Sequence, residues 1–357
     1  MKNSNTKGAR FSIGLDLGDR KSRFCLMSEN EEILREGSVA TTKAAMSRQF
    51  SKFPHARVVM EAGTHSARVS QLLEESGKDV LVANPRMVGR KYLSQTKKND
   101  KTDAHTLAHL GLAPKFFAAP IKHRGRSCQV DLALIRSRDA LVKARTQLIN
   151  HARTIVKGFG ERLPKCTADA FSRKVRPHIP SDLKDALVPV LEQVESITDQ
   201  IKEYDRKVED LCNEKHPQTE ILRQIPGVGY LTSLAFLLTL EDPRRFRKSR
   251  KVGSFLGLVP RQHESGDKAP QLRITKAGND YLRRLLVTSA QYILGFFGPD
   301  SALRQHGKRI EDKGGKAAKK RAVVAVARKL SVLLHRLWLT GEVYEPFYPA
   351  TQSKKAS

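Results

Sequence analysis

Residues 11–18, with the sequence FSIGLDLG, constrain the fold more than any other stretch of the chain. Apolar side chains alternate here with small or acidic ones, and this period of two is typical of a half-buried β-strand. Asp16 lies on the small-residue face, and Gly14 and Gly18 beside it would let a bulky ligand approach closely. One carboxylate at a strand end indicates little by itself, so the role of Asp16 depends on the residues downstream.

The segments that follow predict an α/β domain. Further strands are predicted over residues 23–28, 33–41, 57–61 and 79–83, and helices over 43–53, 64–76 and a stretch that begins near Asp100. Three meandering strands followed by alternating strands and helices is the order of a ribonuclease-H-like mixed sheet. We therefore expect a sheet in which the first strand has a neighbour on each side.

Three more carboxylates occur where they could join Asp16. Glu61 ends a strand that would lie beside the first, and Asp100 and Asp103 would share one face of a helix. Asp100 is also a plausible helix N-cap. Crowded carboxylates repel one another unless a cation lies between them, and Mg²⁺ prefers oxygen ligands. The sequence therefore predicts a site for two Mg²⁺ ions that leaves open positions for phosphate oxygens.

The composition indicates a soluble protein that binds a polyanion. The 357 residues are enough for two or three domains, and the net charge of +28 favours nucleic acid as the partner. No apolar run approaches the ~20 residues of a membrane span, and residues 1–10 lack the apolar core of a signal peptide. Cys25, Cys128, Cys166 and Cys212 have no paired metal-ligand spacing, which argues against zinc and fits reduced thiols in the cytoplasm.

Two helical stretches in the middle of the chain predict an arm. Residues 127–157 are basic, with apolar side chains every seventh residue at Leu134, Leu141, Leu148 and Ile155. The second stretch has apolar residues in steps of four and three, which predicts a coiled coil: Leu183, Leu187, Val190, Val194, Ile197, Ile201, Tyr204, Val208 and Leu211. Pro189 favours a later helix start. The two stretches could pair as a hairpin or with a second chain, and we expect the arm to serve oligomerisation.

A glycine-rich turn and a basic run follow the arm. Residues 218–240 contain the turn IPGVG between two helical stretches and resemble a helix-hairpin-helix, in which Gly227 and Gly229 would let backbone N–H groups meet a phosphate. A plain link between two packed helices is the alternative. The run PRRFRKSRK after it is expected to contact a nucleic-acid backbone through Arg244, Arg245, Arg247, Lys248, Arg250 and Lys251.

The last third of the chain has few residues with an evident chemical role. Ser265 lies in a polar loop, before a helix expected to start at Asn279, and its spacing alone predicts only a turn. A final amphipathic helix is expected to end near Trp338, followed by a disordered tail over 351–357. His65, His105 and His263 are interpreted as surface or polar-network histidines.

Together these motifs resemble the IS110 family of insertion-sequence transposases, the DEDD recombinases. The resemblance covers roughly residues 11–348 and rests on GLDLG, MEAGTHS, KNDKTDA, IPGVG, GSFLGLVP, HESGD and ITKAGNDYLRRLL in this order. It implies a RuvC-like domain over residues 1–120, a helical coiled-coil arm over 121–215 and a mainly helical transposase domain over 216–350.

The resemblance also implies a mechanism. Asp16, Glu61, Asp100 and Asp103 would bind Mg²⁺, and Ser265 would be the nucleophile that forms a covalent phosphoserine link to DNA. The two parts of one active site would come from different protomers, in a tetramer of two dimers. A structured non-coding bridge RNA would pair with donor and target DNA while the enzyme excises and inserts its element. Such a protein would work in the bacterial cytoplasm, at the nucleoid.

Two other functions stay open at this point. A Holliday-junction resolvase would use the same carboxylates with water as the nucleophile in place of Ser265. A non-catalytic nucleic-acid-binding protein would use the carboxylates for structure alone. A covalent protein–DNA adduct would separate the serine mechanism from hydrolysis, and loss of DNA processing in Asp16→Asn with folding intact would exclude the non-catalytic protein.

Overall fold

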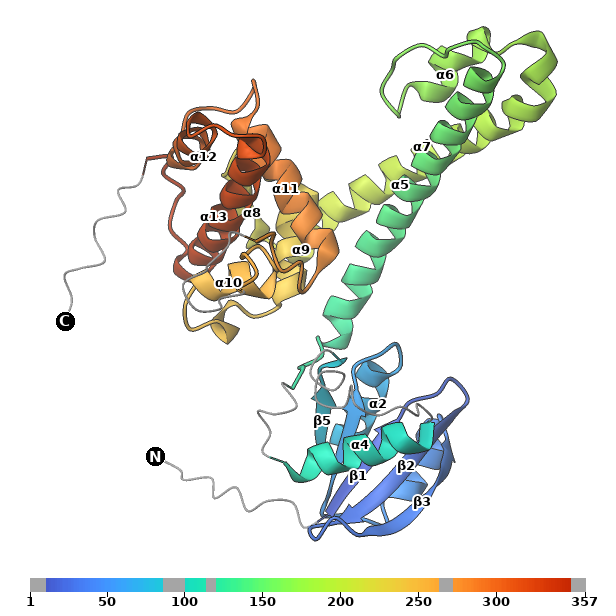
Figure 1. The fold of residues 1–357 in the computed structure, drawn as a ribbon, viewed down its shortest axis with the longest axis vertical. Helices are drawn as coiled ribbons and strands as arrows, with labels where there is room; N and C mark the ends of the chain where they lie inside the picture. Colours follow the sequence, from blue (N-terminus) through green and yellow to red (C-terminus); the bar gives the residue numbers. More distant parts are fainter. Residues whose placement is uncertain (1–10, 86–99, 114–119, 263–271, 348–357) are drawn as a thin grey trace. The chain divides into compact units, whose positions relative to one another are not determined.

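The computed structural model describes residues 11–85, 100–113, 120–262 and 272–347 (Figure 1). The chain divides into two compact units, Met1–Arg124 and Gly125–Ser357, and each is described by itself. The boundary predicted near residue 215 lies inside the second unit and stays a prediction. The predicted tail over 351–357 lies outside the described residues.

The first unit contains a mixed five-stranded sheet. Its strands are β1 Phe11–Asp16, β2 Lys21–Ser28, β3 Ile33–Ala40, β4 Ala56–Glu61 and β5 Asp79–Ala83, and its helices include α1 Lys43–Phe50, α2 Ser66–Glu75 and α4 Asp100–Leu112. The strand order is β3-β2-β1-β4-β5. Strand β1 pairs antiparallel with β2 and parallel with β4, so the predicted mixed sheet is confirmed.

The alternation in β1 places different helices on the two faces of the sheet. Ile13 and Leu15 are fully buried in a core that they share with Phe50 of α1 and Leu73 of α2. The opposite face carries smaller clusters, in which Cys25 of β2 packs against alanines of α4. Asp16 has the same parity as Gly14 and therefore lies on the α4 side of the sheet.

Helix α4 approaches the sheet so closely that the contact requires glycine. A Cβ atom at Gly14 would lie 1.9 Å from the carbonyl oxygen of Ala104, and one at Gly111 would lie 2.0 Å from Ser12 Oγ. We interpreted Gly14 as space for a ligand, and this was wrong because the α4 backbone occupies that space. Arg57 adds a fixed point at the far end of α4, where its Nη1 donates to the carbonyl oxygen of Gly111 at 2.8 Å.

The second unit is helical. Its α-helices are α5 Arg126–Gly158, α6 Phe171–Val175, α7 Lys184–Asp210, α8 Thr219–Arg223, α9 Tyr230–Leu240, α10 Arg250–Phe255, α11 Asp280–Leu294, α12 Ala302–Asp312 and α13 Ala318–Thr340. Helix α9 is apolar on all sides and lies in the largest core, with Leu234 and Phe236 fully buried. Helix α11 begins where the sequence predicted, because Asn279 caps it by accepting a hydrogen bond from the Leu282 N–H at 3.0 Å.

Helices α5 and α7 pack against each other, so the intrachain hairpin is the arrangement that the structure adopts; Figure 1 shows the two helices crossing in the arm. The pairing is antiparallel: Arg138 reaches Asp205 at 2.6 Å, whereas Arg145, one heptad later on α5, reaches Thr198, one heptad earlier on α7, at 3.3 Å. A small core with Phe171 at its centre closes the end of the hairpin. The coiled-coil assignment itself stays a prediction.

The buried faces of both long helices are offset from the predicted seam. On α7 the series Leu187, Val194 and Ile201 is buried as expected, but Leu191 and Thr198 are buried in place of the predicted Val190 and Ile197, which are half-exposed. On α5 the series through Leu141 and Leu148 is likewise half-exposed, next to a buried series: Ile135, Ile149 and Val156. Helix α5 carries two adjacent apolar series with the same period of seven, so periodicity could not show which one faces the partner. On α7 the buried series beside Val190 and Ile197 includes the polar Thr198, which an apolar pattern does not predict.

The expectation for Pro189 was also wrong. Helix α7 begins at Lys184 and contains Pro189 in its interior. This proline lies within the second turn and on the exposed side, so its ring displaces little of the hydrogen-bond ladder.

Candidate active site

Asp16 and Glu61 end two neighbouring strands. Parallel pairing of β1 with β4 sets Leu15 opposite Met60, so the next residue of each strand, Asp16 and Glu61, lies at the same edge of the sheet. The Asp16 side chain is half-buried and the Glu61 side chain is exposed. The first two predicted carboxylates are therefore neighbours.

The direction of α4 brings the other two carboxylates to that edge. Gly111 lies at Ser12, and Ala104 with Ala108 lies at Gly14, so α4 runs antiparallel to β1. The first turn of α4, which carries Asp100 and Asp103, must then lie toward the Asp16 end of the strand. Asp103 is half-buried and Asp100 is exposed.

The donor chemistry of this edge fits a divalent cation. All four side chains offer carboxylate oxygens, the ligands that hard divalent ions prefer. No three of these four carboxylates have oxygens within 4.8 Å of one another in the described part of the chain. Cys25, Glu36 and His105 are the described residues whose ligand atoms lie that close together. An oxygen shell around one ion therefore requires rotation of these side chains, and the backbone has already placed them at one edge.

The histidines near this edge take part in polar contacts, as expected. His65 Nε2 lies 3.3 Å from Asp19 Oδ1, in the turn that follows β1. His105 of α4 contacts Glu36 of β3 through its Nε2 atom. His263 lies outside the described residues.

Ser265, the predicted nucleophile, also lies outside the described residues, but the chain on either side of its segment is described. Arg261 N–H donates to the carbonyl oxygen of Arg273 at 3.0 Å, and Thr275 N–H donates to that of Val259 at 2.9 Å. The two ends of the segment that carries Ser265 are therefore held together in the second unit.

A buried arginine lies beside the two ends of the segment that carries Ser265, and sequence reasoning missed this residue. Arg283 of α11 is 7% exposed. Its Nη1 donates to the carbonyl oxygens of Leu256 and Ala277 at 3.0 and 2.9 Å, and its Nη2 to Asp280 at 2.8 Å. The available signal was a position on the apolar face of α11, where an arginine is expected only if it is paired.

The two glycines of the IPGVG turn lie in different surroundings. Gly227 has a φ of +89°, and a Cβ there would meet the Tyr292 ring at 2.8 Å, so the fold itself requires glycine at this position. Gly229 caps the start of α9 and has nothing within 4 Å of its would-be Cβ. Of the two, only Gly229 leaves room for a phosphate; contact with nucleic acid stays a prediction for both.

All six basic side chains of the predicted backbone-contacting run are exposed: Arg244, Arg245, Arg247, Lys248, Arg250 and Lys251. Phe246 in the middle of the run packs edge-on against Phe255 and His335, with ring centroids 5.3 and 5.7 Å apart. One aromatic anchor thus holds a cationic surface in place.

Comparison with known proteins gives the class of the chain. Residues 13–160 match the DEDD transposase model of IS110 elements, and residues 219–306 match the transposase IS116/IS110/IS902 family. These matches cover the edge with the four carboxylates and the segment that carries Ser265.

Individual relatives agree with these matches. The transposase for insertion sequence element IS1111A of Coxiella burnetii is 31% identical over 269 residues, which cover 70% of this chain and 69% of the relative. A putative transposase of Sinorhizobium fredii, y4pF/y4sB, is 28% identical over 344 residues, covering 93% of this chain and 85% of the relative. The pilin gene-inverting protein of Moraxella bovis is 24% identical over 330 residues, covering 89% of this chain and 92% of the relative.

The chain belongs to the IS110 family of transposases, enzymes that cleave and rejoin DNA. The DEDD domain implies that a divalent metal takes part. Among the described helices, none has the length and apolar character needed to span a bilayer.

Proposed function

We propose that this transposase excises and inserts an insertion-sequence element by strand exchange through a covalent phosphoserine intermediate. Asp16, Glu61, Asp100 and Asp103 would hold Mg²⁺, and Ser265 would attack the DNA. The observation that carries the proposal is the convergence of β1, β4 and the first turn of α4 at one edge of the sheet. Two bound Mg²⁺ ions would polarise the scissile phosphate.

The chemical step conserves the energy of the phosphodiester. Ser265 Oγ attacks the phosphorus, the bond to the 3′-oxygen breaks, and its electron pair stays on that oxygen. The proton lost by the serine hydroxyl passes to a base, and the leaving oxygen gains a proton, so the step is balanced. A serine hydroxyl is a weak nucleophile at neutral pH and needs such activation. Reversal of the step with a new 3′-hydroxyl joins the strand to another partner without ATP.

The proposed partners are donor DNA, target DNA and a structured non-coding bridge RNA. The net charge of +28 and the exposed basic run support binding to phosphate backbones. Backbone contacts carry little sequence information, so base pairing by an RNA would supply the specificity. The relative from Moraxella bovis is named for inverting a gene, an outcome that the same strand exchange would produce.

We also propose that the arm joins chains into a dimer that assembles to a tetramer, with Ser265 and the four carboxylates of one site contributed by different protomers. The half-exposed series on the arm support self-association. In an antiparallel pair of helices, the residues that directly precede the first buried position of each heptad lie on the same side of the pair on both helices. Leu141 and Leu148 of α5 therefore share one side of the hairpin with Val190, Ile197 and Tyr204 of α7.

The test is a denaturing gel of the full-length protein with Mg²⁺, labelled element-end DNA and its candidate RNA. Wild type is expected to shift the label by the mass of the protein, and Ser265→Ala is expected to abolish the shift. Ser254→Ala, an exposed serine of α10, is the matched control and should shift the label like wild type. Asp16→Asn should remove the adduct, whereas Asp19→Asn in the next turn should keep it.

Three outcomes would change the proposal. Cleavage without a shift, equal in wild type and Ser265→Ala, would indicate hydrolysis as in a Holliday-junction resolvase. An adduct that forms equally well without RNA would remove the RNA from the reaction. A large fall in the melting temperature of Asp16→Asn would indicate a structural role for that carboxylate, because asparagine preserves its shape.

A further inference from the structure

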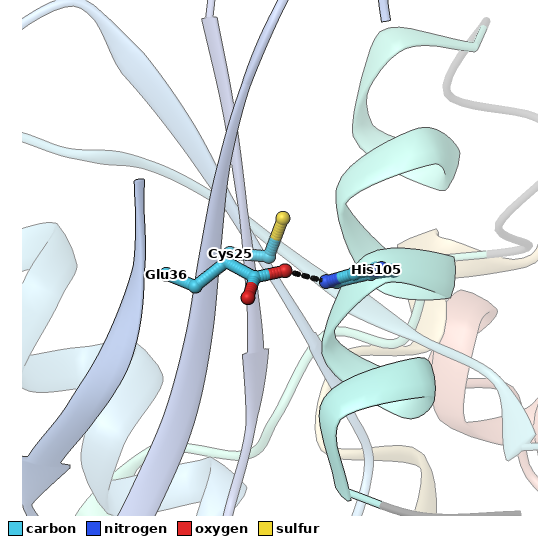
Figure 2. Close-up of side chains that lie close together, drawn as sticks. All are labelled: Cys25, Glu36 and His105. Carbon is cyan, nitrogen blue, oxygen red and sulfur yellow. Dashed lines mark hydrogen bonds and ion pairs between the residues drawn. The ribbon is translucent and has the colours of Figure 1, made fainter. Parts of the chain in front are cut away.

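Cys25, Glu36 and His105 form a cluster of three different metal-ligand types on the α4 face of the sheet. Their Sγ, carboxylate oxygen and imidazole nitrogen atoms all lie within 4.8 Å of one another. Figure 2 shows the imidazole reaching from the helix toward the Glu36 carboxylate, with the Cys25 side chain beside them. No pair of these residues has a metal-ligand spacing in the sequence, since each belongs to a different element.

The elements that carry the three side chains are rigidly placed. Cys25 and Glu36 are directly opposite each other in the β2–β3 pairing. His105 directly follows Ala104, whose carbonyl oxygen would lie 1.9 Å from a Cβ atom added at Gly14. A site whose ligands lie on strands and a closely packed helix loses little entropy when it binds an ion.

Cys25 packs against the alanines of α4, but its thiol has no hydrogen-bonding role there. Cys25 is fully buried, and within the described part of the chain its Sγ makes no hydrogen bond. The thiols of Cys128 and Cys212, by contrast, donate to the carbonyl oxygens of Leu238 and Tyr230. A buried thiol without a hydrogen-bond partner, beside an imidazole and a carboxylate, can therefore serve as a third ligand.

The other two ligands provide access and charge balance. The Glu36 side chain is 31% exposed and that of His105 is 25% exposed, so an ion can enter from solvent and keep a water as its fourth ligand. Lys101 Nζ lies 2.9 Å from Glu36 Oε2 and can hold that oxygen while Oε1 binds the ion. A thiolate and a carboxylate together neutralise a divalent cation.

We propose that Cys25, Glu36 and His105 bind one Zn²⁺ ion, which fastens α4 to strands β2 and β3. A thiolate–imidazole–carboxylate set selects borderline transition ions such as Zn²⁺, whereas the carboxylates at the sheet edge suit Mg²⁺. The proposal does not depend on the serine mechanism. The ion binds in exchange for the thiol proton of Cys25, which passes to solvent.

The test is a titration of the full-length, metal-free, reduced protein with Co²⁺, followed by absorption spectroscopy and back-titration with Zn²⁺. Wild type is expected to bind one Co²⁺ that gives a thiolate-to-metal charge-transfer band, which Zn²⁺ then removes; Co²⁺ at the four carboxylates would give no such band. Cys25→Ser should abolish the band, and Glu36→Gln should weaken Co²⁺ binding about 10-fold or more. The controls Cys212→Ser and Asp16→Asn should keep the band unchanged.

The opposing result is equally definite. A wild-type spectrum without a charge-transfer band, or a band that survives in Cys25→Ser, would overturn the site and leave an ion pair of Glu36 with His105 and Lys101. Serine is nearly isosteric with cysteine, but if Cys25→Ser does not fold, Glu36→Gln decides alone, because a third of that side chain is already in solvent. In that case Co²⁺ affinity equal to wild type refutes the proposal.

Discussion

Two helix contacts in this protein are built in different ways. Helix α4 meets β1 backbone to backbone at Gly14, and its Gly111 lies against the Ser12 side chain, whereas α5 and α7 meet through side chains in the arm. The first contact tolerates no added atom, and it positions the turn that bears Asp100 and Asp103. The second leaves apolar side chains half-exposed on one side of the pair.

The two contacts are suited to different functions. A contact between backbones has one geometry, so it suits an edge where carboxylates from three elements are proposed to share an ion. A contact between side chains can leave one apolar face for a further partner. We expect mutations at the first contact to alter folding and chemistry together, and mutations at the second to separate stability from assembly.

The largest effect is expected for Gly14→Ala. The new Cβ would lie 1.9 Å from Ala104 O and 2.3 Å from Ala108 N, so α4 must move away from β1. We expect a loss of about 3–5 kcal/mol in the free energy of unfolding of the first unit, measured by denaturant titration. Gly158→Ala, which has nothing within 4 Å of its Cβ, is the control and should not destabilise the protein. A Gly14→Ala protein as stable as wild type would show that α4 does not lie on β1 as described.

A smaller effect is expected from two chemically identical changes on α7. Val194 is fully buried against α5, and Val190, one turn earlier, is half-exposed, although the sequence pattern placed both in the seam. Val194→Ala should cost about 2 kcal/mol and Val190→Ala less than about 1 kcal/mol. Thermal melts of the two variants compare them directly. Equal losses of stability in the two variants would support the seam predicted from the sequence, in which both valines face α5.

Assembly is the next test, and here stability should hardly change. Ile197→Lys places a charge on the half-exposed side of the arm, where a second chain is proposed to bind. We expect the dissociation constant for self-association to rise about 10-fold or more in sedimentation experiments, while the melting temperature of the dissociated chain stays the same. Gln200→Lys, at an exposed position on the same helix, adds the same charge as a control. Association unaffected by Ile197→Lys would exclude this face as the interface.

The sequence predicted the local structure of the first unit well. Strand β5 has the predicted bounds, and the alternation around Asp16 identified its face correctly, because a period of two has one interpretation. The occupant of that face could not be predicted, since α4 is distant in sequence and a glycine in a strand suits a ligand or a helix equally. The phase of the arm was not predictable for a related reason, since α5 has two apolar series with one period and α7 buries the polar Thr198 beside Ile197.

The site divides in the same way. The carboxylates at Asp16 and Glu61 could be paired from strand order, and Asp100 with Asp103 from helical spacing. The roles of Arg283 and of the Cys25 cluster depend on contacts between elements far apart in the chain, for which spacing gives no signal. Long-range proximity, and not local conformation, is what the sequence pattern left out.

The smallest expected effect concerns pH and the loop that follows Glu61. His123 Nε2 lies 3.0 Å from Ser66 Oγ, which also donates to the carbonyl oxygen of Gly63. Burial, and secondarily the Arg124 charge, lower the pKa of His123 below its ordinary value of 6.5. Well above pH 6.5 the imidazole is neutral in the folded and unfolded states, so it contributes no pH dependence there.

As the pH falls below 6.5, the unfolded chain binds a proton that folded His123 does not, so stability must decline until the pH passes the folded pKa. His123→Gln should flatten this decline by less than about 1 kcal/mol, because the side chain is only partly buried. His306 in the second unit also has a pKa lowered by burial, so wild type alone cannot isolate the effect of His123. The measurement is therefore the difference in stability between wild type and His123→Gln, from denaturant titrations between about pH 7.5 and pH 5, the range in which histidine titrates. If the difference is confined to the melting of the first unit, the polar contact at the Glu61 loop acts on the sheet alone. A variant with the same pH profile as wild type would instead show that Ser66 holds the loop without help from the imidazole.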